Sequence, residues 1–246
     1  VLPELQAQLI HLPGTYRWKP PVCSDNAPDD MSTGNPIHEA MGALPAVADG
    51  AEDAQSTDDR QNRFSLSLGN LVHQALAHIA QCHKKGISYG QAAMHEYLEQ
   101  RLPELDAYPD QWQSVKETTI RHIDTTLADA VGQWILAPNA HGQIEWPITT
   151  VNDRLPKRLI MDRVFFDEDC WWIIDFKTAE PDPSEAFEDF FEQEVRRYRD
   201  QLEQYRSALS ALLSDQPNRF GSTAVTTAPI KTALYFTALA HLETLP

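Results

Sequence analysis

The chain has 246 residues, 42% of them hydrophobic, which is enough for one sizeable core in one or two domains. No run of 18 uncharged apolar residues occurs, so the sequence predicts no membrane-spanning helix. A formal net charge of −16 argues against a nucleic-acid partner. However, nine acidic residues in 20–59 and seven in 179–194, two stretches without Lys or Arg, account for all of this excess. The rest of the chain is formally neutral, so a polyanionic partner stays possible.

The N-terminal part of the chain has the composition of a linker. Residues 20–62 are rich in Pro, Gly, Ala, Ser and Asp, which predicts an acidic, flexible segment. We therefore expect an N-terminal segment and linker over 1–62 and one folded domain over 63–246. The chain begins with Val and no signal peptide is visible, so we expect a piece of a longer cytoplasmic protein.

Helical spacing of apolar residues predicts three helices in the first half of the domain. The first starts after Ser65 or Ser67 and ends at Gly86, the second covers 88–102, and the third runs from about 109 to 136. Three segments rich in β-branched and aromatic residues then predict strands at 142–151, 158–166 and 171–178. A long helix over 183–213 and a strand over 230–239 complete the pattern. This order predicts an α/β (α+β) fold with a sheet flanked by helices.

Two of these strands each carry a carboxylate within an apolar run, in "RLIMDRVFFDEDCWWIIDFKT". If Asp167 and Cys170 close a two-residue turn, Asp162 lies directly opposite Asp175. The period of a strand then places Lys177 on the same face as Asp175. The two carboxylates are expected to face each other on that side of the sheet, in strands too apolar to lie on the open surface.

Two opposed, buried carboxylates repel each other unless a cation lies between them. Hard oxygen ligands suit Mg²⁺ or Mn²⁺, and such an ion activates water and stabilises negative charge on a phosphate. A nearby ammonium group adds to that stabilisation. The pattern therefore predicts phosphodiester hydrolysis. The competing interpretation is a cross-strand Asp–Lys pair that only compensates a polar spot.

The segments "MDRV" and "IIDFKT" resemble the core of the PD-(D/E)XK nuclease superfamily, in its RecB-like branch. That branch forms the C-terminal nuclease domain of AddA- and RecB-type helicase–nuclease subunits. "GNLVHQALAHI" with His73, "IEWPI" with Glu145 and "YRDQLEQYRSAL" with Gln201 and Tyr205 follow the order of the family's other motifs. The resemblance covers about residues 63 to 240. It implies a restriction-endonuclease-like αβββαβ core with a mixed sheet and extra N-terminal helices.

The resemblance also implies the site residues and the cofactor. The metal, Mg²⁺ with Mn²⁺ as a substitute, is expected to be held by His73, Asp162, Asp175 and the backbone carbonyl of Phe176. The expected catalytic residues are Asp162, Asp175, Lys177 and Glu145. Gln201 and Tyr205 share a helix face and are expected to order Lys177 or to touch DNA. Independently of the resemblance, Arg197 and Arg199 lie in the local basic stretch "RRYR", which indicates either phosphate contacts or a solvated helix face.

Some relatives carry a four-cysteine iron–sulfur cluster, which the dispersed Cys23, Cys82 and Cys170 cannot supply, so no cluster is expected. No helicase motif is present in the sequence, which places any motor outside this chain. We therefore expect a Mg²⁺-dependent exonuclease of double-strand break repair and recombination. It would cut single-stranded DNA fed by a helicase region of the same polypeptide, beside an AddB- or RecC-like subunit. A free-standing RecB-like exonuclease, or an inactive nuclease fold that binds DNA or a subunit, remains the alternative.

Overall fold

The computed structural model describes residues 52–88, 90–152, 155–216 and 219–245. Cys23, the N-terminal segment and most of the expected linker lie outside these residues. Within them, no helix combines the length and the apolar character that crossing a bilayer requires. The helices before the sheet are α1 (Glu52–Lys84), α2 (Gln91–Arg101), η1 (Leu102–Glu104), η2 (Pro109–Gln111), α3 (Trp112–Ala128) and α4 (Ala130–Leu136).

Helix α1 begins earlier than the sequence pattern predicted. It starts at Glu52, so residues 52–62, which we assigned to the linker, are helical. This stretch contains no Gly or Pro, and its acidic start suits the positive end of the helix dipole. Arg63 also pairs with Asp106 at 2.8 Å, and the Tyr108 hydroxyl donates to Asp59 at 3.1 Å. These contacts attach the first turns to the η1–η2 segment.

The single helix expected over 109–136 is divided at Asp129. The backbone of Asp129 is extended, with φ −87° and ψ 135°, and its side chain accepts hydrogen bonds from Gly132 N at 2.9 Å and from Tyr235 Oη at 2.8 Å. Asp129 is therefore the N-cap of α4. A Cβ atom at Gly132 would lie 2.1 Å from the Thr126 carbonyl oxygen, so only glycine permits this close turn.

The strands form one mixed sheet in the order β1-β2-β3-β4-β5. Only β3 and β4 pair in parallel, and the other neighbours are antiparallel. The parallel pair requires a crossover, which α5 and the short α6 supply. This arrangement confirms the predicted α/β fold with the αβββαβ core; β5 and α6 were not predicted. The elements are β1 (Ala140–Asn152), β2 (Leu155–Asp167), β3 (Cys170–Lys177), α5 (Phe187–Asp215), α6 (Thr223–Thr226), β4 (Ile230–Phe236) and β5 (His241–Thr244).

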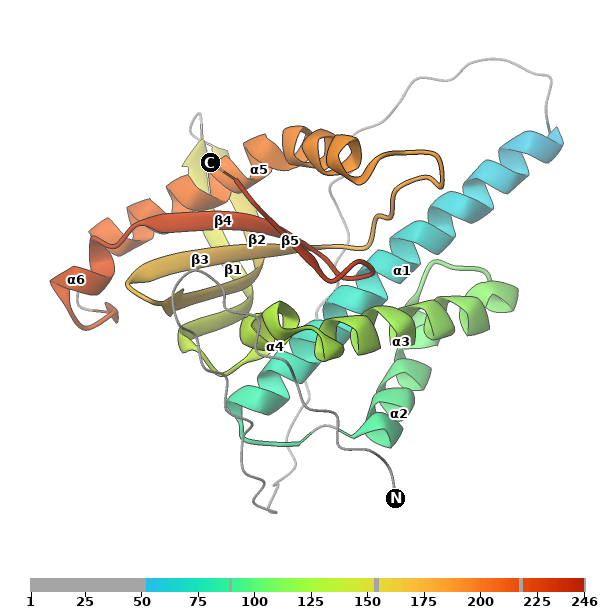
Figure 1. Ribbon diagram of the computed structural model, residues 1–246, viewed down its shortest axis with the longest axis horizontal. Coiled ribbons are helices and arrows are strands. Elements are labelled where there is room, and N and C mark those ends of the chain that lie inside the picture. The colour runs from blue at the N-terminus through green and yellow to red at the C-terminus, as the bar shows by residue number, and fades with distance from the viewer. Residues whose placement is uncertain (1–51, 89, 153–154, 217–218, 246) are drawn as a thin grey trace.

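Helices cover both faces of the sheet, as Figure 1 shows. Helices α1 to α4 pack on one face around Phe165, Ile174 and Tyr235. Helix α5 packs on the other face, where Leu202 and Leu209 meet strand residues that include Ile173. The middle strands are thus buried on both sides, which explains their nearly continuous apolar sequence.

The β2–β3 hairpin has the predicted turn. Asp167 pairs with Cys170, and the two residues between them, Glu168 and Asp169, have φ angles of 45° and 59°. Two left-handed residues are typical of a type I′ turn, whose twist matches that of the strands. The paired register continues to Arg163 and Ile174, so the next residues along are Asp162 and Asp175.

A buried arginine joins α4 to the sheet. Arg163 is 2% exposed and donates to the carbonyl oxygens of Ile135 at 2.8 Å, Ala137 at 2.7 Å and Gln143 at 3.1 Å. Replacing Arg163 with Met would leave three carbonyl groups without this donor, so we expect a loss of about 3 kcal/mol or more in unfolding free energy. Urea denaturation measures this loss. Arg158→Met, at an exposed position of the same strand, is the control and should change stability little; similar losses in both variants would contradict the assigned role.

Candidate active site and metal centre

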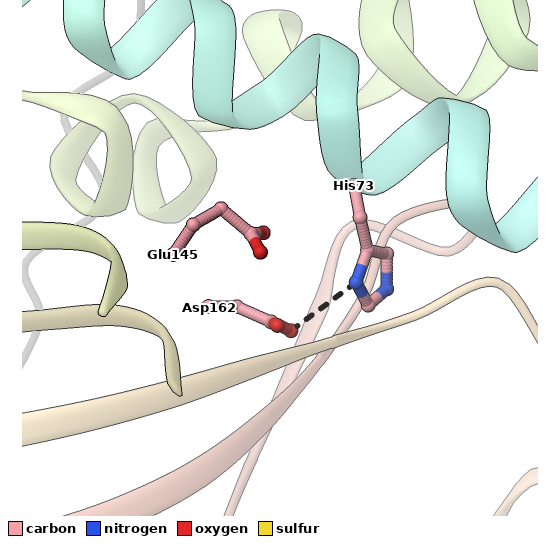
Figure 2. A group of neighbouring side chains, drawn as sticks. All are labelled: His73, Glu145 and Asp162. Carbon is pink, nitrogen blue, oxygen red and sulfur yellow. Dashed lines mark ion pairs between the residues drawn. The ribbon is translucent and has the colours of Figure 1, made fainter. Parts of the chain in front are cut away.

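Side chains of a strand normally alternate between the two faces of the sheet, and this alternation is interrupted at one residue pair in β1 and β2. Met161 and Trp146 pack on the α5 side of the sheet, whereas Arg163 reaches α4 and Ile144 packs with the α1–α4 side. Between them lie Glu145 and Asp162, at opposite positions in the two strands. Glu145 has a φ of 48°, in the left-handed region that a non-glycine residue adopts only at a cost. This break lets the two carboxylates turn toward α1, and Figure 2 shows them pointing at one histidine.

That histidine is His73 on α1, the residue that the family resemblance implies as a metal ligand. Its Nε2 lies 2.9 Å from the carbonyl oxygen of Phe176, and its Nδ1 lies 3.5 Å from Asp162 Oδ2 (Figure 2). Asp162 Oδ2 also accepts a hydrogen bond from the Phe176 amide at 2.8 Å. Phe176, the middle residue of the D-x-K segment in β3, is thereby connected to both α1 and β2.

His73, Glu145 and Asp162 form a group able to hold a cation. One ligand atom from each lies within 4.8 Å of the others. Two carboxylates and one imidazole suit Mg²⁺ or Mn²⁺ better than a soft metal. Neighbouring ligands of an octahedral ion with bonds of about 2.1 Å lie about 3 Å apart, which is close to the 3.5 Å between His73 Nδ1 and Asp162 Oδ2. The residues present therefore fit a divalent cation.

The protonation of these groups reflects their crowding. Burial raises the pKa of Glu145, with a further contribution from the Asp162 charge, to about 7. Burial lowers the pKa of His73, but the Asp162, Asp175 and Glu145 charges outweigh it and raise the value to about 9. Burial also opposes ionisation of Asp162, yet His73 and the Phe176 amide hold its pKa below the ordinary value. Without metal, His73 thus acts as the counter-ion of the carboxylates.

This protonation predicts how metal affinity depends on pH. A cation must displace the proton of His73, whose pKa is about 9, and below about pH 7 also that of Glu145. We therefore expect Mn²⁺ affinity to increase about tenfold per pH unit between about pH 7 and 9, and more steeply below. Calorimetric titration in two buffers of different ionisation enthalpy measures both the affinity and the released protons. An affinity that stays constant across this range, with no proton release, would contradict the assignment.

Asp175 and Lys177 face α5. Asp175 is 3% exposed, its Oδ2 lies 2.6 Å from Lys177 Nζ, and its Oδ1 accepts a hydrogen bond from Gln201 Nε2 at 3.2 Å. Gln201 Nε2 also donates to the Tyr205 hydroxyl at 2.7 Å. Burial and the charge of the nearby Asp162 raise the pKa of Asp175, which Lys177 opposes. The ion pair places Asp175 and Lys177 together, as the strand period predicted.

The structure gives the contacts of two groups of expected site residues. Asp162 and Asp175 are opposed in register; Asp162 contacts His73 on α1 and the Phe176 amide in β3, whereas Asp175 contacts Lys177 and Gln201 on α5. Gln201 contacts Asp175, the ion-pair partner of Lys177, so the expected role of the Gln201–Tyr205 pair in ordering Lys177 or touching DNA stays a prediction. Asp175 is accordingly not a member of the three-residue group, although its charge lies near enough to shift the pKa of His73.

A sequence model described as the PD-(D/E)XK nuclease superfamily matches residues 46–239. The chain belongs to this superfamily. No curated protein matches the chain significantly. The resemblance assigns the D…D-x-K pattern in the superfamily's name to Asp162, Asp175 and Lys177, and this assignment stays a prediction. Membership indicates a metal-dependent nuclease, for which DNA is the suggested substrate, and the His73 group is a possible site for the divalent metal that such nucleases typically use.

One contact of this PD-(D/E)XK site was not predicted. The ring of Tyr198, on α5, lies under the Lys177 ammonium, with Nζ 3.3 Å from the ring centroid. The sequence does contain a signal, because Tyr198 precedes Gln201 and Tyr205 by three and seven residues and shares their helix face.

The predicted phosphate contacts lie on the outer surface of α5. Arg197 and Arg199 are both exposed, and Arg197 lies 3.4 Å from Glu194. Their exposure is compatible with phosphate contacts, which stay a prediction. Cys82 and Cys170 are free thiols.

Proposed function

We propose that this domain is a Mg²⁺-dependent deoxyribonuclease that degrades single-stranded DNA from an end. The observation that carries the proposal is the arrangement of two neighbouring charged groups, one formed by α1, β1 and β2 and the other by β3. The His73–Glu145–Asp162 group lies beside the buried Asp175–Lys177 ion pair. A purely structural core has no need of three buried or half-buried carboxylates with pKa values shifted by one another.

The residues have separate proposed roles. His73, Glu145 and Asp162 would hold the cation, together with Asp175 and the Phe176 carbonyl that the resemblance implies. When bound, the ion supplies Lewis acidity and an activated water. Lys177, whose side chain is 13% exposed, places an ammonium group where it can stabilise charge on the phosphate in the transition state. Gln201 holds Asp175 in place through its hydrogen bond.

We further propose that the domain serves an AddA- or RecB-type helicase–nuclease in double-strand break repair and recombination. Five motifs in the order of that branch support this assignment. In such an enzyme a helicase region of the same polypeptide delivers the single strand, an AddB- or RecC-like subunit is the partner, and the complex works in the cytoplasm. Arg197 and Arg199 would then contact the phosphates of the incoming strand.

Cleavage of end-labelled oligonucleotides tests the proposal. The domain should degrade single-stranded DNA faster than duplex, require Mg²⁺ or Mn²⁺, and release short products from one labelled end. Circular single strands should resist, because they have no end. Cleavage of circles at the same rate would replace the exonuclease with an endonuclease. Absence of cleavage with every divalent metal, together with retained DNA binding, would favour the inactive DNA-binding fold.

A further inference from the structure

Lys177 has an unusually close aromatic neighbour. Its Nζ lies 3.3 Å from the centroid of the Tyr198 ring, while the other cation–ring distances among the described residues are between 4.8 and 5.7 Å. The Lys177 side chain is only 13% exposed. An ammonium shielded from water and placed over a ring face is attracted more strongly than one at the open surface.

The backbone beneath Lys177 is already fixed. Its carbonyl oxygen accepts hydrogen bonds from Thr237 N at 2.9 Å and from Thr237 Oγ1 at 3.0 Å. What remains free is a four-carbon side chain, whose rotamers differ little in energy and must be restricted by contacts. The two contacts that restrict the ammonium are the Asp175 carboxylate at 2.6 Å and the Tyr198 ring.

These two contacts differ in what happens during catalysis. Asp175 is a proposed metal ligand, so a bound cation would share its charge and weaken its hold on Lys177. The ring of Tyr198 coordinates no metal, and it cannot take the proton of the ammonium. It therefore keeps its attraction for Lys177 in the metal-loaded state.

We propose that Tyr198 is a positioning residue that holds the Lys177 ammonium toward the reacting phosphate through the face of its ring. This inference rests on the proposed nuclease function. One face of α5 then has two positioning roles. Gln201 orients the carboxylate of Asp175, and Tyr198, one turn earlier, orients its ammonium neighbour.

Three substitutions at Tyr198 separate the ring from the hydroxyl. Tyr198→Leu should lower kcat on the order of tenfold, while KM for single-stranded DNA and Mn²⁺ affinity stay within about twofold of wild type. Tyr198→Phe and Tyr198→Trp should recover most of this loss, because both keep a ring face beside Lys177. Phe187→Leu, at an exposed ring of the same helix, is the matched control and should turn over normally.

A second readout does not depend on activity. A ring face close to Lys177 shifts the NMR signals of the Lys177 ε-methylene protons upfield. We expect this shift in wild type and in Tyr198→Phe but not in Tyr198→Leu. The signal is assigned to Lys177 by its loss in Lys177→Arg. If wild type cleaves no DNA while the ring shift is present, the nuclease proposal fails and the contact stands. Normal kcat in Tyr198→Leu, equal losses in the Leu and Phe variants, or no ring shift in wild type would overturn the positioning role.

Discussion

Replacing Asp175 with Asn should reduce DNA cleavage by at least about 10³-fold, the largest loss expected for any single change in this domain. The substitution keeps the shape of the side chain and removes the charge that the cation and Lys177 require. Single-turnover cleavage of a labelled single strand at saturating Mg²⁺ measures the loss.

The same variant should fold as well as wild type or better. Burial and the Asp162 charge raise the folded-state pKa of Asp175 above its ordinary value. Ionising such a group costs stability at pH values above its unfolded pKa, and a neutral Asn removes this cost. Asp169→Asn, in the exposed hairpin turn, is the control for loss of one carboxylate. Near-normal cleavage by Asp175→Asn would remove Asp175 from the active site.

Lys177→Ala should slow cleavage on the order of 10²–10³-fold while leaving Mn²⁺ and DNA binding near the wild-type level. A protonated amine has no lone pair for a metal, so its contribution belongs to the transition state and affects kcat. Lys177→Arg should restore only part of the rate, because a planar guanidinium does not reproduce a compact charge. Stopped-flow or quench kinetics give kcat, and titration gives the two affinities.

The ion pair with Asp175 raises a structural alternative for Lys177. If the lysine serves only as the counter-ion of a buried carboxylate, its removal leaves Asp175 unpaired and lowers the melting temperature. The folded fraction would then cleave at the normal rate. Turnover and melting temperature measured on the same preparation distinguish the two roles: reduced stability with normal turnover would end the catalytic interpretation.

The hairpin that places the acidic pair could be predicted because its signals are local. Glu168 and Asp169 lie between two apolar runs, and a two-residue turn fixes which residues of β2 and β3 oppose each other. The family resemblance implied that His73 lies beside Asp162 and Asp175, and in the structure His73 Nδ1 is 3.5 Å from Asp162 Oδ2.

Other features depend on tertiary contacts that no sequence pattern encodes. The left-handed backbone at Glu145 opposes the usual preference of glutamate and is maintained by the surrounding sheet. The break at Asp129 interrupts a continuous helical pattern, because its carboxylate caps α4 and accepts from Tyr235. Gln201 contacts Asp175 and Tyr198 contacts Lys177 because of how α5 packs on the sheet. Helix periodicity alone does not determine that packing.

The most direct test of the metal centre is the Mn²⁺ dependence of thermal stability in wild type and in Asp162→Asn. A ligand that binds only the folded state adds about 2.7 kcal/mol at a concentration about a hundred times its Kd. We predict a clear rise in the melting temperature of wild type with Mn²⁺ and little or none in Asp162→Asn, while Glu180→Asn, a change in the acidic segment after β3, responds like wild type. Equal rises in wild type and Asp162→Asn would contradict a metal centre formed by His73, Glu145 and Asp162.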